Sequence, residues 1–186
     1  MGVNRFGLNS TVINKKALLT TLKELFYLKE YIVEEKTYLN IVLVHPQIPN
    51  NTGNIGRLCV GCHAKLHLVK PLGFEISDSR VKRAGLDYWK DLDITIHESF
   101  DDLTKLISNK ERMFLLSARA STSIYETKFK NGDWLFFGKE AKGLSAEIQE
   151  EYKNQLRTIP FPGPIRSFNL GNAVAMVLGE CLRQLT

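Results

Sequence analysis

The chain has 186 residues, of which 44% are hydrophobic and 24% are charged, so it is long enough to bury the core of one soluble domain. Its formal charge of +5 and its pI of about 9.1 favour an anionic partner such as nucleic acid. No apolar run approaches the roughly 18 residues of a membrane span, and charges interrupt the apolar residues near the N-terminus. The sequence therefore predicts neither a membrane segment nor a secretion signal, and we expect a cytoplasmic protein.

Residues 1–38 differ in composition from the rest of the chain. After a polar start, the stretch "KKALLTTLKELFYLKEYIVEEK" repeats its apolar residues at near-helical spacing, which predicts an amphipathic helix. We expect residues 1–38 to be an accessory, partly helical segment and residues 39–186 to form the main domain.

From residue 40 onward, short apolar runs alternate with helical patterns. The runs are "NIVLV", "LHLVK", "ITIH", "RMFLLS" and "WLFFG". Such alternation predicts an α/β fold with a parallel sheet flanked by helices. Ser99 and Asp102 fit a capping box at the start of the helix "SFDDLTKLIS". The last predicted helix, over residues 170–182, carries its apolar residues on one stripe.

The segment "CVGCH", from Cys59 to His63, formally matches the C-x-x-C-H pattern of haem attachment and half of a zinc site. Either site would need a second element, and His45, His67 and His97 show no suitable spacing. We therefore expect these cysteines to pack as small apolar residues, and we expect no metal.

Three loops are unusually rich in Gly, Asn, Pro or Ser, and each lies next to a predicted strand. They are "PNNTGNIGR", "FGKEAKGLS" and "IPFPGPIRSFNLGNAVA". The second has the glycine spacing of a P-loop, but Leu144 and Ser145 follow Gly143 where Lys and Ser or Thr belong. Ordinary turn chemistry explains any one of these loops taken alone. Parallel α/β domains tend to bind ligands at such loops, beyond the carboxyl ends of the strands.

Together and in order, these loops resemble the three motifs of the SPOUT superfamily of RNA methyltransferases. The similarity is strongest to the bacterial enzymes that methylate the ribose 2'-oxygen of the tRNA wobble nucleotide, a cytidine or a modified uridine. It rests on "PNNTGNIGRLC", "KRAGLDYW", "FGKEAKGL" and "RSFNLGNAVA", and it covers residues 39–185. The resemblance implies a parallel sheet whose C-terminal part forms a trefoil knot, S-adenosylmethionine as methyl donor, tRNA as substrate, and a homodimer.

By matched position, the resemblance implies a set of site residues. The cofactor would be held by Leu116, Gly138, Ile159 and Ser167, largely through backbone groups. Glycine and proline suit loops of this kind because a close approach of the backbone requires missing side chains.

The first motif implies two further residues, Asn54 and Arg57, beside the methyl donor and the RNA. Arg57 is the predicted catalytic residue: it would clamp a phosphate and stabilise the developing alkoxide, while a phosphate oxygen or water takes the proton. The alternative role of Arg57 is a surface ion pair.

The other motifs imply supporting or RNA-binding residues. Glu140 would support the site, or would cap the helix that follows it. Asn169 and Asn172 would either cap the last helix or bind the cofactor and orient Arg57. Arg166 and the basic residues 80–85 would contact phosphates, or would form a solvated charged face.

The chain departs from the family pattern at three positions. It has His45 where an acidic residue is usual, Gly171 where a small hydroxyl residue is common, and Gly179 where an aromatic residue often stands. Two alternative functions follow from the resemblance: 2'-O-methylation of another RNA such as ribosomal RNA, and a catalytically silent RNA-binding module.

Overall fold

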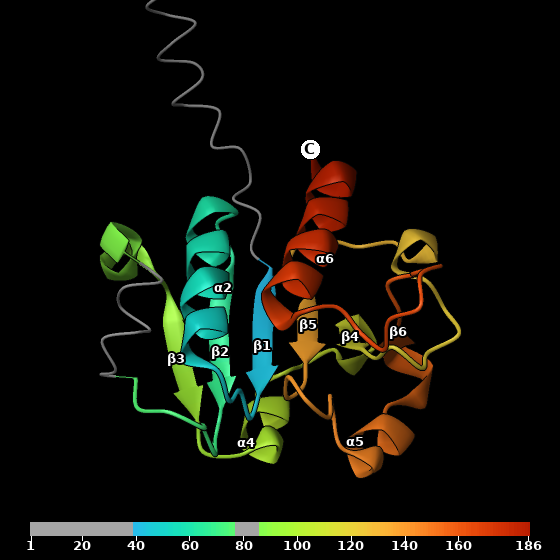
Figure 1. Cartoon of the computed structure of the whole chain (residues 1–186), viewed down its shortest axis with the longest axis horizontal. Helices are drawn as coiled ribbons and strands as arrows, with labels where there is room; N and C mark the ends of the chain where they lie inside the picture. The colour runs from blue at the N-terminus through green and yellow to red at the C-terminus, as the bar shows by residue number, and fades with distance from the viewer. Residues whose placement is uncertain (1–38, 77–85) are drawn as a thin grey trace, which may run out of the picture. The chain divides into compact units, whose positions relative to one another are not determined.

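The computed structural model of the chain describes residues 39–76 and 86–186 (Figure 1). Six strands of this part form one sheet in the order β3-β2-β1-β5-β4-β6, and every neighbouring pair is parallel. The strands are β1 (Asn40–Val44), β2 (Lys65–Val69), β3 (Ile94–His97), β4 (Met113–Leu116), β5 (Trp134–Phe137) and β6 (Leu156–Arg157). The predicted parallel α/β architecture is confirmed. The predicted N-terminal segment 1–38 and the basic residues 80–85 lie outside the described residues.

Helices cover both faces of the sheet. Two longer helices, α2 (Pro49–Gly61) and α6 (Leu170–Leu185), lie side by side on one face (Figure 1). The shorter helical elements are α4 (Phe100–Lys105), α5 (Ala146–Glu151) and the 3₁₀ turns η1 (Leu86–Asp91), η2 (Lys110–Arg112), η3 (Ile124–Glu126) and η4 (Lys153–Gln155). No described helix combines the length and apolar content that crossing a membrane requires.

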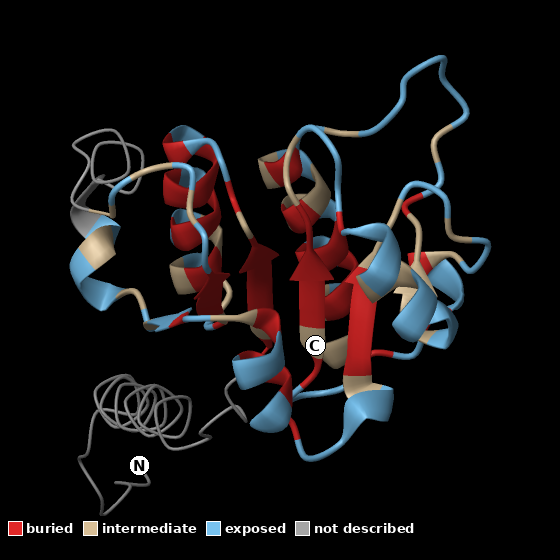
Figure 2. Cartoon of the chain, turned by 90° about the horizontal axis from the view of Figure 1, so that it is seen from below, coloured by how far each residue is buried: buried red, intermediate tan, exposed pale blue. Residues whose placement is uncertain are grey.

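The central strands β1, β2, β4 and β5 are buried on both faces, and the alternation of their side chains divides the core in two. Ile41 and Leu43 belong to one apolar cluster with Val174 of α6, whereas Val42 and Val44 belong to a second cluster with residues of α4. A parallel sheet covered on both sides needs such unbroken apolar strands, which Figure 2 shows as buried. The run "NIVLV" therefore forms a central strand.

The start of α4 and the packing of the cysteines were both predicted from the local sequence. The Ser99 hydroxyl accepts a hydrogen bond from the Asp102 backbone N–H (3.1 Å) and donates one to the Asp102 carboxylate (2.7 Å), so the predicted helix start is confirmed. Cys59 is fully buried in the core and Cys62 is half-buried, which is the packing expected for small apolar side chains.

Two buried histidines form a polar chain across the sheet. Nδ1 of His67 lies 3.0 Å from Nε2 of His97, and Nε2 of His67 lies 3.2 Å from Oδ1 of Asn40. The Asn40 oxygen can only accept, so His67 carries its proton on Nε2 and accepts a hydrogen bond from His97 on Nδ1. Burial is the main cause that lowers the pKa of His67 to about 4, and burial also lowers the pKa of His97.

We expect the protein to lose stability as the pH falls from 7 to 5. The unfolded chain, whose histidines have a pKa near 6.5, then binds a proton that folded His67 excludes. The free energy of unfolding should fall by about 2 kcal/mol over this interval. Urea unfolding at the two pH values measures the change. Replacing the exposed His63 by Gln should leave the drop intact, and an unfolding free energy that is constant from pH 7 to 5 would contradict the assignment.

Candidate active site

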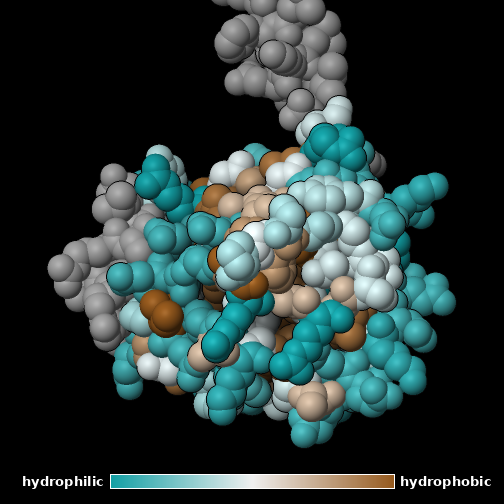
Figure 3. All heavy atoms as spheres, turned by 45° about the vertical axis from the view of Figure 1, so that its right-hand side comes forward, coloured by the Kyte–Doolittle hydropathy of each residue, from teal (hydrophilic) through white to brown (hydrophobic). Residues whose placement is uncertain are grey.

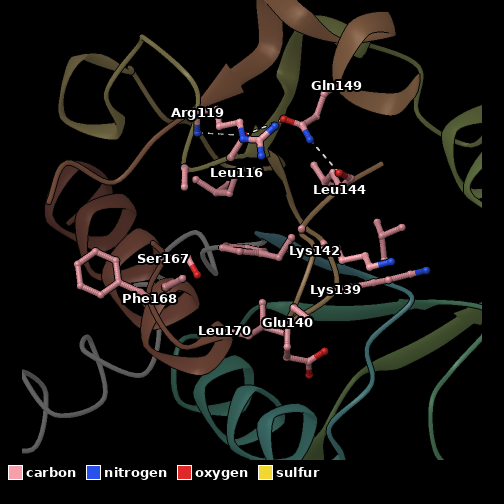
Figure 4. A pocket seen from close by; sticks show the side chains of 18 of the residues that line it. Leu116, Arg119, Lys139, Glu140, Lys142, Leu144, Gln149, Ser167, Phe168 and Leu170 are labelled. Carbon is pink, nitrogen blue, oxygen red and sulfur yellow. Dashed lines mark hydrogen bonds between the residues drawn. The ribbon is translucent and has the colours of Figure 1, made fainter. Parts of the chain in front are cut away.

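The carboxyl ends of β4 and β5 open into a pocket of about 760 Å³. The four residues predicted to hold a cofactor, Leu116, Gly138, Ile159 and Ser167, all line it. Leu116 and Ser167 are labelled in Figure 4. The four residues come from three loops that are far apart in the sequence, and the sheet brings these loops together because the ends of parallel strands meet at one edge. Their role as cofactor ligands stays a prediction.

The loop after β5 is closed on itself. The Gly143 N–H donates to the Lys139 carbonyl (2.8 Å), and the Lys139 N–H donates to the Gly143 carbonyl (3.1 Å). A Cβ on Gly138 would lie 2.0 Å from the Gly143 carbonyl carbon, and Gly143 has a φ of +68°. Both glycines are therefore required by the backbone, which forms a rigid wall of the pocket.

A glutamine of α5 joins two walls of the pocket. The Ser117 hydroxyl donates to Oε1 of Gln149 (2.8 Å), and Nε2 of Gln149 donates to the Leu144 carbonyl (2.8 Å). Gln149 therefore holds the loop after β4 at a set distance from the loop after β5. Gln149 was not among the predicted site residues, because nothing in the local pattern of α5 distinguishes it from a surface residue.

The loop after β6 is anchored to the loop after β4. The Thr158 N–H donates to the Thr122 carbonyl, and the Ile124 N–H donates to the Thr158 carbonyl, both at 2.9 Å. Farther along, the rings of Phe161 and Phe168 meet edge to face with their centroids 5.5 Å apart, and both residues line the pocket. The two hydrogen bonds hold the start of this loop to the loop after β4, and the ring contact joins the two ends of the segment that carries Ser167.

Glu140 points from the pocket loop toward the start of α2 (Figure 4). Its carboxylate accepts hydrogen bonds from the N–H groups of Gln47 (2.9 Å) and Ile48 (3.0 Å), and from the Asn51 amide (3.2 Å). The side chain of Ile48, the N-cap residue of α2, provides no cap of its own, so Glu140 supplies the negative charge that a helix N-terminus favours. The expectation that Glu140 caps the following helix is wrong, because Ser145 caps α5.

Asn169 extends this network to α6. Its Oδ1 accepts hydrogen bonds from the N–H groups of Gly171 (2.9 Å) and Asn172 (3.4 Å), which caps the helix. Its Nδ2 donates to Oδ1 of Asn51 (3.1 Å). The capping role is confirmed for Asn169. For Asn172 it is wrong, because Asn172 lies inside the first turn and is itself capped.

Asn51 connects α2 to the loop after β5, through Glu140, and to the start of α6, through Asn169. It was not among the predicted site residues. It is buried with 7% of its surface exposed, on the side of α2 that also carries Ile55 and Cys59. A polar side chain on an otherwise apolar helix face was the available signal, because a buried amide requires hydrogen-bond partners.

Asn54 and Arg57 lie on the opposite, exposed side of α2. The Arg57 guanidinium sits over the ring of Tyr88, 5.1 Å from its centroid. Next to Arg57 on α2, Gly56 leaves room for close packing, since a Cβ there would come within 2.9 Å of the end of the Leu92 side chain. Within residues 39–76 and 86–186, neither side chain forms an ion pair or lines the pocket. The surface ion pair considered for Arg57 is therefore not observed there.

His45 ends β1 at the pocket and adopts a left-handed backbone conformation with a φ of +54°. Non-glycine residues rarely adopt this conformation, and such strain is concentrated at functional sites. Burial, followed by the positive charge of Lys139, lowers the pKa of His45 below its usual value. The lowered pKa of His45 favours the neutral imidazole in the pocket.

Comparison with known proteins places this arrangement in a family. Residues 38–179 match the SpoU rRNA Methylase family. The chain is 43% identical over 147 residues to the tRNA (cytidine(34)-2'-O)-methyltransferase of Burkholderia cenocepacia (strain HI2424), a match that covers 78% of this chain and 94% of that protein. It is 44% identical over 152 residues to the protein of the same name from Yersinia pestis. That match covers 79% of this chain and 94% of the Y. pestis protein.

The chain is also similar to a protein of known structure. That structure is described as "Structural insights into the 2-OH methylation of C/U34 on tRNA", is 42% identical, and superposes with a TM-score of 0.78 over 81% of this chain and 97% of that chain. The family match includes all three loops around the pocket. The chain therefore belongs to the SpoU rRNA Methylase family.

Proposed function

We propose that the protein transfers a methyl group from S-adenosylmethionine to the ribose 2'-oxygen of the wobble nucleotide, a cytidine or a modified uridine, in a tRNA anticodon loop. The similar proteins of B. cenocepacia and Y. pestis carry the name of this activity. The observation that carries the proposal is the hydrogen-bonded chain from Glu140 through Asn51 to Asn169. It joins the loop that lines the pocket to the helix that bears Arg57 and to the start of α6.

The pocket fits the proposed cofactor in size and chemistry. Its volume of about 760 Å³ is typical of a small-molecule site. Leu116, Leu144 and Ile159 provide apolar walls for a flat base, and Gly138 leaves the backbone accessible beside them. We expect Leu116, Gly138, Ile159 and Ser167 to hold S-adenosylmethionine, which when bound supplies a methyl group on a sulfonium.

The chain's own contribution to catalysis is positioning and charge. Holding the ribose oxygen about 3 to 3.5 Å from the methyl carbon provides much of the rate. Arg57 binds an RNA phosphate and stabilises the developing alkoxide, and the proton passes to a phosphate oxygen or to water. Arg57 is not the base, because a guanidinium does not give up its proton in proteins.

We further propose that two copies of the chain pair to complete the site. Arg57 and Asn54 project from α2 away from the pocket of their own chain, so a second copy can supply them. The exposed face of the neighbouring α6 carries Met176, which is 36% exposed, and Gly179, where an added Cβ would meet nothing within 4 Å. A face with a methionine and a glycine, and with few charges, suits contact between identical helices.

Replacing Gly179 by Glu should convert the dimer to a monomer and lower methyl transfer at least 10-fold. A Cβ there meets nothing within 4 Å in the single chain, so the charge would act at the contact with the partner. Sedimentation at micromolar concentration measures the change. Replacing the exposed Asn154 of η4 by Glu adds the same charge elsewhere and should leave the dimer intact. A wild-type monomer with full activity would contradict the pairing.

The C-terminal trefoil knot is also a proposal. The chain reaches β6 at the edge of the sheet beyond β4 and then returns to α6, beside α2. On the way it passes the loop after β4, where the Ser117 N–H donates to the Arg157 carbonyl (2.9 Å) and Thr158 bonds to Thr122. These contacts support the threading of residues 158–170 through that loop.

Methyl transfer from labelled S-adenosylmethionine to undermodified total tRNA tests the function. Nucleoside mass spectrometry should identify 2'-O-methylcytidine or a 2'-O-methylated uridine from the wobble position. A tRNA with a 2'-deoxy wobble nucleotide should accept no methyl group, because the acceptor hydroxyl is missing. Methylation of ribosomal RNA but not tRNA would favour the other RNA substrate, and cofactor binding without transfer to any RNA would favour the silent binding module.

A further inference from the structure

Four positively charged side chains surround the pocket. Arg119 follows β4, Lys139 and Lys142 follow β5, and Arg166 follows β6. Three of them are exposed and Lys139 is half-buried. We call these four residues the cationic rim.

The positive charge of the cationic rim is not neutralised by nearby carboxylates. Within the part of the chain that the structure describes, none of the four forms a salt bridge, although Lys70, Lys105 and Arg112 do. The one acidic residue lining the pocket, Glu140, uses both carboxylate oxygens on the N-terminus of α2. The positive charge of Lys139 is also one of the causes that lower the pKa of His45. The opening therefore presents a net positive field to solvent.

The arrangement of the rim suits a chain of phosphates better than one small anion. A small anion is held by groups that converge, whereas Lys139 and Lys142 extend to one side of the pocket and away from Ser167 (Figure 4). The face turned toward the viewer in Figure 3 also carries long hydrophilic side chains beside more apolar surface. Phe161 and Phe168 line the same pocket, and aromatic rings together with cations are typical of single-stranded nucleic-acid sites.

We propose that the cationic rim binds the phosphates of the single-stranded loop on either side of the target nucleotide. This inference rests on the proposed function and adds the surface that positions the substrate. Contacts to phosphate fix the register of an RNA on a protein without reading its sequence, so the rim would place one ribose over the pocket whatever its base. Each single-strand phosphate contact contributes about 0.7 to the slope of log affinity against log salt.

The test is the salt dependence of tRNA binding by the full chain. Fluorescence anisotropy with labelled undermodified tRNA, between 50 and 300 mM salt, gives the slope of log affinity against log salt concentration. For the double variant Lys139→Gln, Lys142→Gln this slope should be lower in magnitude than the wild-type slope by about 1.4. Its affinity near 0.1 M salt should fall about 20-fold. The variant Lys139→Arg, Lys142→Arg keeps both charges and should keep the wild-type slope.

A matched control lies at the other end of the same strands. Lys110 precedes β4 and Lys130 precedes β5, and both are exposed. The double variant Lys110→Gln, Lys130→Gln therefore removes the same charge at the amino ends of these strands, away from the pocket. Equal slopes for the rim variant and this control would overturn the inference. A different outcome separates the two proposals. If the wild type methylates no RNA, but only the rim variant binds tRNA more weakly and with a smaller salt dependence, then the proposed function is wrong and the inference about phosphate binding by the cationic rim still holds.

Discussion

Replacing Gly138 by Ala should lower the affinity for S-adenosylmethionine at least 100-fold. The added Cβ would lie 2.0 Å from the Gly143 carbonyl carbon and 2.1 Å from the Leu144 nitrogen. Both contacts are with backbone, so no rotation of a side chain can relieve them, and the pocket wall formed by the loop must move. Isothermal titration calorimetry with S-adenosylmethionine measures the loss.

The same substitution should also cost stability, by about 3 kcal/mol, because overpacking a rigid loop strains it. Gly61→Ala is the matched control, since a Cβ at the exposed end of α2 meets nothing within 4 Å and should leave affinity and stability unchanged. An affinity of Gly138→Ala within three-fold of the wild type would mean that this loop does not form the cofactor site.

Replacing Arg57 by Ala should lower the single-turnover rate of methyl transfer by about 100-fold or more while the affinity for S-adenosylmethionine changes by less than three-fold. The side chain lies on the exposed face of α2 and does not line the pocket of its own chain, so cofactor contacts are preserved. What is lost is the charge that stabilises the alkoxide in the transition state. Calorimetry and rapid-quench kinetics separate the two quantities.

Arg57→Lys should restore little of this rate, because an ammonium group cannot reproduce the planar, bidentate contact of a guanidinium with phosphate. Lys105→Ala, in α4 on the opposite face of the sheet, removes the same charge and should leave the rate unchanged. A normal single-turnover rate for Arg57→Ala would assign the residue to its contact with Tyr88 alone.

Five of the six strands were predictable individually, but the strand order was not. The sixth strand, β6 (Leu156–Arg157), has only two residues, and no apolar run predicted it. Runs such as "NIVLV" and "WLFFG" are apolar throughout, as expected for strands buried on both faces. Because such runs resemble one another, no local sequence pattern indicates that β5 lies between β1 and β4. That order depends on which strands bury each other's surface, and it decides which loops meet at the pocket.

Two of the three predicted loops, those after β5 and β6, line the pocket. The expectation of a loop at "PNNTGNIGR" is wrong, because these residues form the start of α2 and do not line the pocket; the loop after β4 is its third wall. The family resemblance named Leu116, Gly138, Ile159 and Ser167 among the lining residues. The resemblance did not indicate how these residues are connected. Glu140 caps a helix that begins about ninety positions earlier in the chain, and the Asn51 to Asn169 hydrogen bond spans 118 positions. Gln149 joins two loops that no sequence pattern links.

The amino-acid sequence by itself determined the α/β class, the helix start at Ser99, the need for glycine in the pocket loops and the family. Each of these depends on periodicity, turn chemistry or a local motif, which neighbouring residues specify among themselves. Only the tertiary structure decided that Glu140, Asn51 and Asn169 form one network and that Arg57 faces away from the pocket. The physical reason is that a buried polar group needs a partner, and the fold supplies that partner from distant parts of the chain.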